Sequence, residues 1–166
     1  MPPPNRPPFI VSTADVPETT HRYPKSKEPM GPARAIGRAA GLLKIGLHVQ
    51  RVPPGHRISW PHAESREEEF VYVLDGEVDA WIDGALHPMK AGDLAAFPSG
   101  TGICHTFLND GDREAVLLSG GEADKSENRI YYPLNPGRRG DLPWSRWWDD
   151  VPQHPRGTHD GKPRPR

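Results

Sequence analysis

Two stretches of this chain decide its fold. Residues 62–76 read HAESREEEFVYVLDG, and residues 92–109 read GDLAAFPSGTGICHTFLN. In the first stretch His62, Glu64 and Glu69 precede or open a β-branched, apolar run, and in the second His105 opens a similar one. Imidazole nitrogen and carboxylate oxygen together suit divalent first-row metal ions. The two stretches therefore predict a metal site carried on short strands.

Strand parity predicts how these side chains are placed. Residues two apart on a strand point to the same side, so His62 should face with Glu64, and Glu69 with Val71. If the strands line one barrel mouth, His62, Glu64, Glu69 and His105 converge on one ion and leave positions open for water or substrate. Without a metal, Glu64 and Glu69 would repel each other, so the pKa of one would rise and suit it to general acid or base work. Glu64 and Glu69 are therefore the candidate catalytic residues.

The centre of the chain is predicted to consist of strands and turns. Asp75-Gly76, Asp83-Gly84 and Asp110-Gly111 each separate extended-looking segments and are strong hairpin signals. Residues 35–43 predict one or two helical turns. Runs rich in β-branched and aromatic residues predict strands over 47–52, 69–74, 85–89, 94–97, 103–108 and 114–119. Closely spaced short strands of this kind predict an all-β antiparallel sandwich or barrel.

The two ends of the chain differ from its centre in their proline content. Most of the 21 prolines lie in residues 1–32 and 133–166, which disfavours regular helix or sheet there. We expect a Pro-rich N-terminal arm (1–34), a barrel domain (35–132) and a Pro/Trp-rich C-terminal arm (133–166). Clustered apolar residues in both arms indicate straps laid over the barrel, whose outermost parts, 1–6 and 158–166, should be mobile. The aromatic clusters around Tyr131-Tyr132 and Trp144, Trp147 and Trp148 could form a lid, an arm exchanged between subunits, or a cover for an apolar face, and we favour the cover.

Composition and charge exclude several classes of protein. The formal net charge is −1, so there is little attraction for a phosphate backbone, and we expect no nucleic-acid partner. No apolar run approaches the roughly 20 residues of a membrane span, and the start has no signal-peptide core, so we expect no membrane association and a cytoplasmic location. The single cysteine, Cys104, excludes an internal disulfide and is predicted to be a small buried thiol.

Several polar and aromatic residues near the motifs are given structural roles. His48 and Gln50 share one strand face, which either lines the cavity or faces solvent. Trp60 shares parity with His62 and is expected to wall the pocket. Residues 66–68 are expected to form a solvated charged loop, so Glu67 is excluded from the site. Asn109 is expected to be a turn residue, and Trp81 to have a packing role.

The spacing of both stretches resembles the two motifs of the cupin superfamily. In the first motif, Gly55 is followed by six residues to His62, then Glu64, four residues to Glu69 and six to Gly76. The second motif matches at Gly92, Pro98, Gly100, His105 and Asn109, with four residues instead of two before the histidine. The resemblance implies a double-stranded β-helix, or jelly-roll barrel, and a homodimer. It also implies a divalent ion such as Mn, Fe, Ni or Zn bound by the motif residues.

One departure from the motif bears on the metal. Glu64 stands where the family usually has a second histidine, so two histidines and two glutamates would make a divalent centre neutral. A neutral centre attracts anionic substrates less and favours Mn(II) or Fe(II) over copper.

The resemblance is closest to small bacterial single-domain cupins, some of which carry a sugar-phosphate isomerase label. We therefore predict a metal-binding cupin that acts on a small polar metabolite, with isomerisation of a sugar or sugar phosphate as one such reaction. An Fe(II)-dependent dioxygenase and a non-catalytic small-molecule-binding module are the alternatives.

Overall fold

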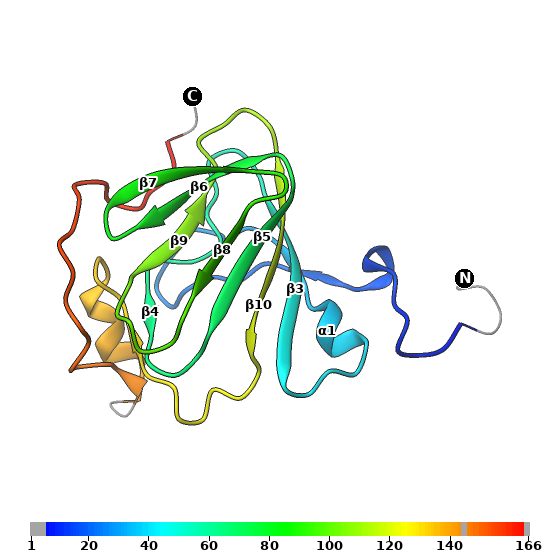
Figure 1. Cartoon of the computed structure of the whole chain (residues 1–166), viewed down its shortest axis with the longest axis horizontal. Helices are drawn as coiled ribbons and strands as arrows, with labels where there is room; N and C mark the ends of the chain where they lie inside the picture. Colours follow the sequence, from blue (N-terminus) through cyan, green and yellow to red (C-terminus); the bar gives the residue numbers. More distant parts are fainter. Residues whose placement is uncertain (1–5, 144–145, 165–166) are drawn as a thin grey trace.

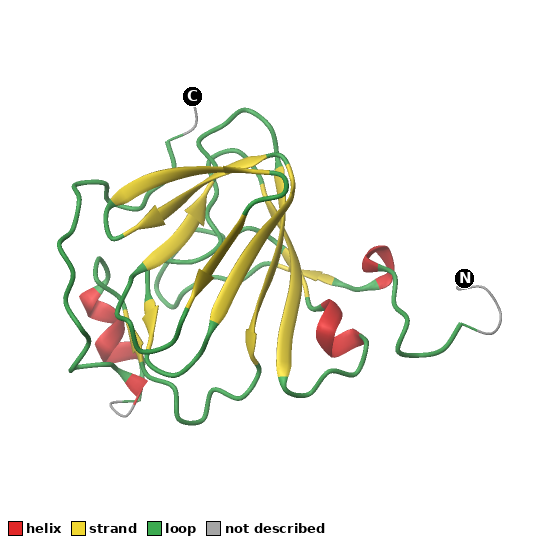
Figure 2. Ribbon diagram, in the orientation of Figure 1, coloured by secondary structure: helices red, strands yellow, loops and turns green. Residues whose placement is uncertain are grey.

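The computed structural model describes residues 6–143 and 146–164 of the chain, which form two packed β-sheets and a small additional sheet (Figures 1 and 2). The predicted all-β double-stranded β-helix is confirmed. The helical elements include α1 (Ile36–Ala39) and the 3-10 turns η1 (Thr13–Asp15) and η2 (Pro136–Asp141). In the described part of the chain, no helix is long and apolar enough to cross a membrane.

The larger sheet has six strands in the order β1-β2-β3-β10-β5-β8. Its central strands alternate buried and exposed residues, as expected for a sheet with one face on the core. The short strand β2 extends this sheet from within the segment predicted as the N-terminal arm. The strand bounds are β1 Glu18–Thr19, β2 Ala33–Arg34, β3 Ile45–Val52, β10 Ala115–Glu122, β5 Glu69–Asp75 and β8 Leu94–Phe97.

The second sheet has three strands, β7 (Ala85–Lys90), β6 (Glu77–Ile82) and β9 (His105–Leu108), and β4 (Ala63–Glu64) pairs separately with β11 (Ile130–Tyr131). The predicted hairpin at Asp83-Gly84 is confirmed, since both residues have positive φ and join the paired strands β6 and β7. The other two Asp-Gly predictions are wrong as hairpins. They join strands of different sheets, because a double-stranded β-helix passes the chain from one sheet to the other. Strand β6 was not among the predicted strands.

The core lies between the two sheets. From β5, Val71 and Val73 point inward, while Phe107 of β9 faces them from the other sheet, and all three are almost fully buried. By the same alternation, Phe70, Tyr72 and Leu74 lie on the outer face of the six-stranded sheet. Inward-facing residues of both sheets therefore form one apolar layer, and the site sits at one end of it.

The outer face of the three-stranded sheet is covered by residues 147–161, here called the C-terminal strap. Trp148 packs with Trp81 and Cys104, so it has the predicted role of a cover. Trp147 packs in a separate cluster with Tyr23 and Tyr132, and Trp144 lies outside the described residues. The Trp81 indole donates to the carbonyl of His159 at 2.8 Å. The predicted packing role of Trp81 and the buried Cys104 thiol are confirmed as well.

The strap continues into contacts with the barrel, so residues 159–164 do not fit the prediction of a mobile end. The buried Arg57 guanidinium donates to the carbonyl of Gly161 at 2.7 Å and pairs with Glu28 at 2.7 Å. This arginine joins the N-terminal segment, the barrel and the strap. Residues 1–5 and 165–166 of the segments predicted to be mobile lie outside the described residues.

Candidate metal centre

His62 and His105 are direct neighbours across a β-bridge. The His62 N–H donates to the His105 carbonyl at 3.1 Å, and the His105 N–H donates to the His62 carbonyl at 2.9 Å. Such a pair places both side chains on the same face of the sheet. The two imidazole rings accordingly lie with their centroids 5.0 Å apart. The residue before β4 and the first residue of β9 thus supply two adjacent nitrogen donors.

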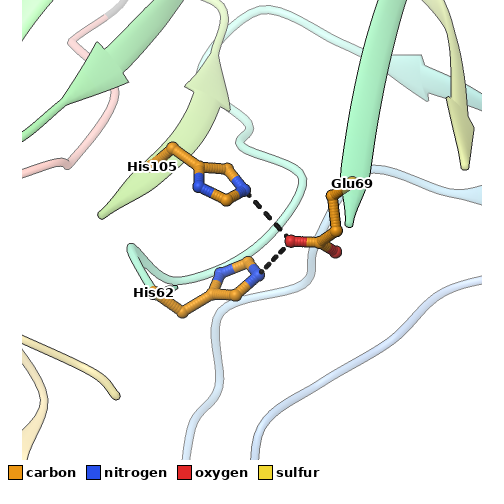
Figure 3. A group of neighbouring side chains, drawn as sticks. All are labelled: His62, Glu69 and His105. Atoms are coloured by element: carbon orange, nitrogen blue, oxygen red, sulfur yellow. Dashed lines mark hydrogen bonds and ion pairs between the residues drawn. The ribbon is translucent and has the colours of Figure 1, made fainter. Parts of the chain in front are cut away.

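Glu69 reaches the same point from the other sheet (Figure 3). It is the first residue of β5, and its Oε2 lies 3.3 Å from His62 Nε2 and 3.1 Å from His105 Nε2. Glu69 was predicted to share a strand face with Val71, and because Val71 is buried in the core, Glu69 also faces the interior. The structure therefore brings together three of the four predicted donors, His62, Glu69 and His105, at the end of the barrel core.

The second ring nitrogen of each histidine faces a backbone carbonyl. His62 Nδ1 lies 2.7 Å from the Trp60 oxygen, and His105 Nδ1 lies 3.4 Å from the Ile103 oxygen. With the proton of a neutral imidazole on Nδ1, both Nε2 atoms present lone pairs to the Glu69 carboxylate. Three lone-pair donors this close require a cation among them, either a proton or a metal ion. Orientation of the far ring nitrogen is typical of metal-binding histidines.

The pKa values in the metal-free site show that a proton can take this role. Burial opposes charge on His62, but the Glu69 and Glu64 carboxylates outweigh it and raise the pKa of His62 to about 9. Burial likewise opposes charge on Glu69, yet the charged His62 beside it holds the pKa of Glu69 well below the usual range. Burial lowers the pKa of His105. The metal-free centre is therefore a His62 imidazolium paired with the Glu69 carboxylate.

Glu64 lies beside this centre rather than in it. Its Oε1 is 3.7 Å from His62 Nε2, and its Oε2 accepts a short hydrogen bond from the side-chain amide of Asn128. Burial raises the pKa of Glu64 to about 7, with His62 opposing the rise and Glu69 adding to it. A carboxyl group that titrates near neutrality can both accept and donate a proton.

The three converging donors fit a divalent ion. Ligands bound at about 2.1 Å lie roughly 3.0 Å apart at right angles and roughly 3.4 Å apart at tetrahedral angles. The two nitrogen-to-oxygen distances, 3.1 and 3.3 Å, fall in this range before any adjustment. His62, Glu69 and His105 would hold the ion, and Glu64 would need to turn from Asn128 to become a fourth ligand.

The centre opens into a cavity of about 800 Å³, large enough for a small-molecule ligand. His48 and Gln50, whose orientation the sequence left open, both line it. Trp60 does not wall the cavity as predicted; it stacks on Tyr23 with ring centroids 4.2 Å apart, and Tyr23 lines the cavity instead. The wall combines apolar and polar side chains, including Leu42, Ile45, Ile58, Val71, Phe107, Ser59, Tyr132 and Lys125.

Glu67 was missed by the sequence prediction. Its side chain is 4% exposed, it lines the cavity, and it forms an ion pair with Lys125. Gly121 makes the necessary room, since a Cβ there would lie 2.5 Å from Glu67 Oε1. The Asn128 side-chain oxygen also accepts the Glu67 N–H at 3.3 Å. The prediction of a solvated loop is therefore wrong for Glu67, although its neighbours Arg66 and Glu68 are exposed.

Asn109 and Cys104 have structural environments. The Asn109 amide donates to the carbonyls of Val52 and Arg113, both at 2.7 Å, which confirms the predicted turn role. Burial raises the pKa of the Cys104 thiol to about 12, with Asp83 adding to the rise, so the thiol is unreactive at neutral pH.

Comparison with known proteins places the chain in a family. A family model described as a cupin domain matches residues 48–120. Protein SchB from Streptomyces halstedii is 34% identical over 109 residues, covering 66% of this chain and 73% of SchB. Polyketide synthase CurC from Streptomyces cyaneus is 36% identical over 83 residues, covering 50% of this chain and 49% of CurC, so the match spans about half of that relative.

Solved structures agree with these matches. The crystal structure of a sugar phosphate isomerase from a cupin superfamily, from Silicibacter pomeroyi, has a TM-score of 0.67 and 28% sequence identity. That likeness covers 74% of this chain and 80% of the isomerase chain. The matched segment contains Glu69 of β5, His105 of β9 and His62, the residue before β4. The chain therefore belongs to the cupin superfamily.

Proposed function

We propose that this cupin is a metal-dependent enzyme that moves a proton on a small hydroxy-carbonyl compound. The observation that carries the proposal is the convergence of His62, Glu69 and His105 at the base of the cavity, with the protonatable Glu64 beside them. A divalent ion held by the three donors would supply Lewis-acid polarisation of a substrate oxygen. A site with two imidazole nitrogens and carboxylate oxygen favours Mn(II) or Fe(II) as the bound ion.

In this proposal the residues of the chain have distinct tasks. The backbone carbonyls of Trp60 and Ile103 orient the two histidines, and the ring of Phe97 stacks on His105. Asn128 holds Glu64 at the edge of the centre, where its carboxyl group takes a proton from carbon or oxygen and returns it at a neighbouring atom. Apolar side chains such as Ile58, Val71 and Phe107 form part of the cavity wall.

Sugar or sugar-phosphate isomerisation is one reaction of this kind, and the similarity to the Silicibacter pomeroyi isomerase supports it. The similarity to CurC supports a second substrate class, a polyketide intermediate, because aldol-type ring closure also begins with removal of a proton next to a carbonyl. Both reactions use the same arrangement of ion, base and cavity.

An Fe(II)-dependent dioxygenase is the second candidate function. Two histidines and one carboxylate, as in His62, His105 and Glu69, form the donor set of many non-haem iron oxygenases. Oxygen uptake that requires iron and a substrate would favour this function over proton transfer.

Metal analysis tests the shared core of both candidates. We expect protein purified without chelators to contain about one divalent ion per chain, and Glu69→Gln and His105→Ala to lose it. Glu68→Gln is the matched control, since Glu68 is the exposed neighbour of Glu69. Equal metal content in Glu69→Gln and Glu68→Gln would contradict the proposal. A metal-free wild type that binds a metabolite would instead favour a non-catalytic binding module.

We also propose that the protein forms a homodimer through the outer face of its six-stranded sheet. A row of apolar residues, Val49, Leu118, Tyr72 and Leu94, crosses four strands there, and Leu94 is 61% exposed. The outer face of the other sheet is covered by the C-terminal strap, whereas in the described residues no comparable segment covers this row. An exposed apolar sheet face of this kind is suited to packing against its copy about a two-fold axis.

A further inference from the structure

The Glu67–Lys125 ion pair is a part of the cavity that the metal centre does not use. Glu67 lies on the loop between β4 and β5, and Lys125 follows β10, so the pair closes the cavity wall from two sides. The Glu67 side chain is 4% exposed, whereas that of Lys125 is 45% exposed. Carboxylate oxygens of Glu64, Glu67 and Glu69 lie within 4.8 Å of one another, so the pair is close to the reacting end of any bound substrate.

Charged side chains on the described cavity wall are mostly acidic. In the metal-free site they are Glu64, Glu67, Glu69 and Glu122 against Arg38, Lys125 and the His62 imidazolium. Arg38 is an exposed residue of α1 and His62 is paired with Glu69, so Lys125 is the remaining cation next to the acidic cluster. His48 adds no charge at neutral pH, because burial and the nearby Lys125 lower its pKa. A phosphate or carboxylate that enters this cavity away from the metal centre would depend on Lys125.

Lys125 is not free to bind an anion at low cost. An anion that accepts from the Lys125 ammonium would lie against the buried Glu67 carboxylate and close to those of Glu64 and Glu69, and these like charges would repel it. Glu67 has little freedom to move away, because Gly121 and the Asn128 side chain confine it. A hydroxyl group meets no such penalty: it can accept from the Lys125 ammonium and donate to a Glu67 oxygen while the ion pair stays intact.

We propose that the Glu67–Lys125 pair selects an uncharged, hydroxyl-bearing substrate and excludes phosphorylated or carboxylated ones. This inference rests on the proposed function, because it assumes that the substrate occupies the cavity of the metal centre. It narrows the substrate class: an unphosphorylated sugar or a neutral polyketide-type ketone fits, and a sugar phosphate does not. Glu67 and Lys125 are thus specificity-determining residues.

The test uses inorganic phosphate as the probe and isothermal titration calorimetry as the measurement. Full-length wild type, Glu67→Gln, Lys125→Gln and the double variant are titrated, each both metal-loaded and chelated. Glu127→Gln is the matched control, because it removes one negative charge from the loop that carries Lys125 while its side chain is 73% exposed and pairs with Arg66. Circular dichroism and metal content are recorded for every variant.

We expect no saturable phosphate binding by wild type or Glu127→Gln, and at least about tenfold tighter binding by Glu67→Gln, lost again in the double variant. Phosphate binding by wild type that Lys125→Gln weakens would overturn the inference, whether or not Glu67→Gln folds. So would equal phosphate affinities for Glu67→Gln and Glu127→Gln. Failure of the proposed function can be distinguished from failure of this inference. Absence of metal from wild type would contradict the proposed function, whereas the phosphate titrations of the chelated proteins would still test whether the Glu67–Lys125 pair excludes anions.

Discussion

The ring of Phe97 lies parallel to the ring of His105, with centroids 3.6 Å apart and planes 8° apart. Phe97 ends β8 in the six-stranded sheet, and His105 begins β9 in the other sheet. The stack therefore fixes the rotation of one candidate metal ligand by contact with the opposite side of the barrel. It complements the carbonyl of Ile103, whose oxygen lies 3.4 Å from Nδ1 of the same imidazole.

Loss of this stack should weaken metal binding. For Phe97→Leu we expect roughly 10-fold lower Mn(II) affinity, because supporting contacts of a ligand are worth about 10–100-fold. The accompanying loss of folding stability should be about 1–3 kcal/mol. Phe107→Leu is the matched control: Phe107 is fully buried in the same core and meets Phe97 edge-on at 6.1 Å. Equal metal affinities for the two variants, measured by calorimetry, would show that the stack does not orient His105.

Metal binding should release protons. His62 has a pKa of about 9 in the metal-free protein, so at pH 7.5 it is charged and must lose its proton before Nε2 can bind an ion. We expect release of about one proton per ion, measured by calorimetry in buffers of different ionisation enthalpy. Binding heats that do not depend on the buffer would refute the assignment of His62 as a ligand.

The stability of the metal-free protein should fall as the pH rises from 6.5 to 9, whereas below 6.5 the lowered pKa values of His105 and His48 act in the opposite direction. The pKa of Glu64 rises from 4.5 to about 7 on folding, so its stabilising contribution is present below 4.5 and is lost as the pH passes 7. That of His62 rises from 6.5 to about 9, so its contribution is present below 6.5 and is lost toward 9. The lowered pKa of Glu69 contributes stability above 4.5 and does not change within this interval.

Thermal unfolding with a chelator present measures this trend. In wild type the unfolding temperature should decrease from pH 6.5 to 9, and Glu64→Gln should change the profile below pH 7 and leave the decrease above pH 7 in place. A flat profile for wild type would be inconsistent with a charged, buried His62. Glu122→Gln provides a control, since Glu122 is an exposed carboxylate at the end of β10.

Leu94→Glu tests the proposed dimer. A charge placed in the apolar row of the outer sheet face should convert a dimer into a monomer, because two copies of it would meet near the two-fold axis of an interface. Light scattering after size-exclusion chromatography gives the mass. Leu134→Glu, at a residue 38% exposed and outside that row, should leave the mass unchanged. A monomeric wild type would refute the dimer directly.

The sequence was sufficient to predict the barrel and the convergence of His62, Glu69 and His105, because both depend on local patterns. Alternation along 69–74 separates inward Val71 and Val73 from outward Tyr72, and the motif spacing places His62 and His105 on neighbouring strands. The hairpin at Asp83-Gly84 was predictable because a two-residue turn needs positive φ at both positions, and Asp-Gly adopts it readily. The other two Asp-Gly pairs failed as hairpins because pairing of the flanking strands depends on the whole sheet arrangement.

The environments of Glu64 and Glu67 could not be predicted from local sequence. Glu64 faces the same side as His62, as expected from their spacing. However, its hydrogen-bond donor, Asn128, lies 64 residues further along the chain. Glu67 stands on a loop without periodicity, in a run of charged residues that normally faces water. It is buried only because Gly121 leaves space and Lys125 supplies a counter-charge. No pattern within residues 62–76 signals either partner.

The strap passes the β6–β7 turn at a point where only main chain fits. A Cβ at Gly84 would collide with the backbone of Gly157, and a Cβ at Gly157 would collide with the backbone of Gly84, while Gly157 N–H donates to the Asp83 carbonyl at 2.7 Å. Because backbone atoms form both sides of this contact, no change of a neighbouring side chain can make room. During evolution the two positions would therefore be unable to compensate for each other, and each would have to stay glycine for as long as the strap takes this path.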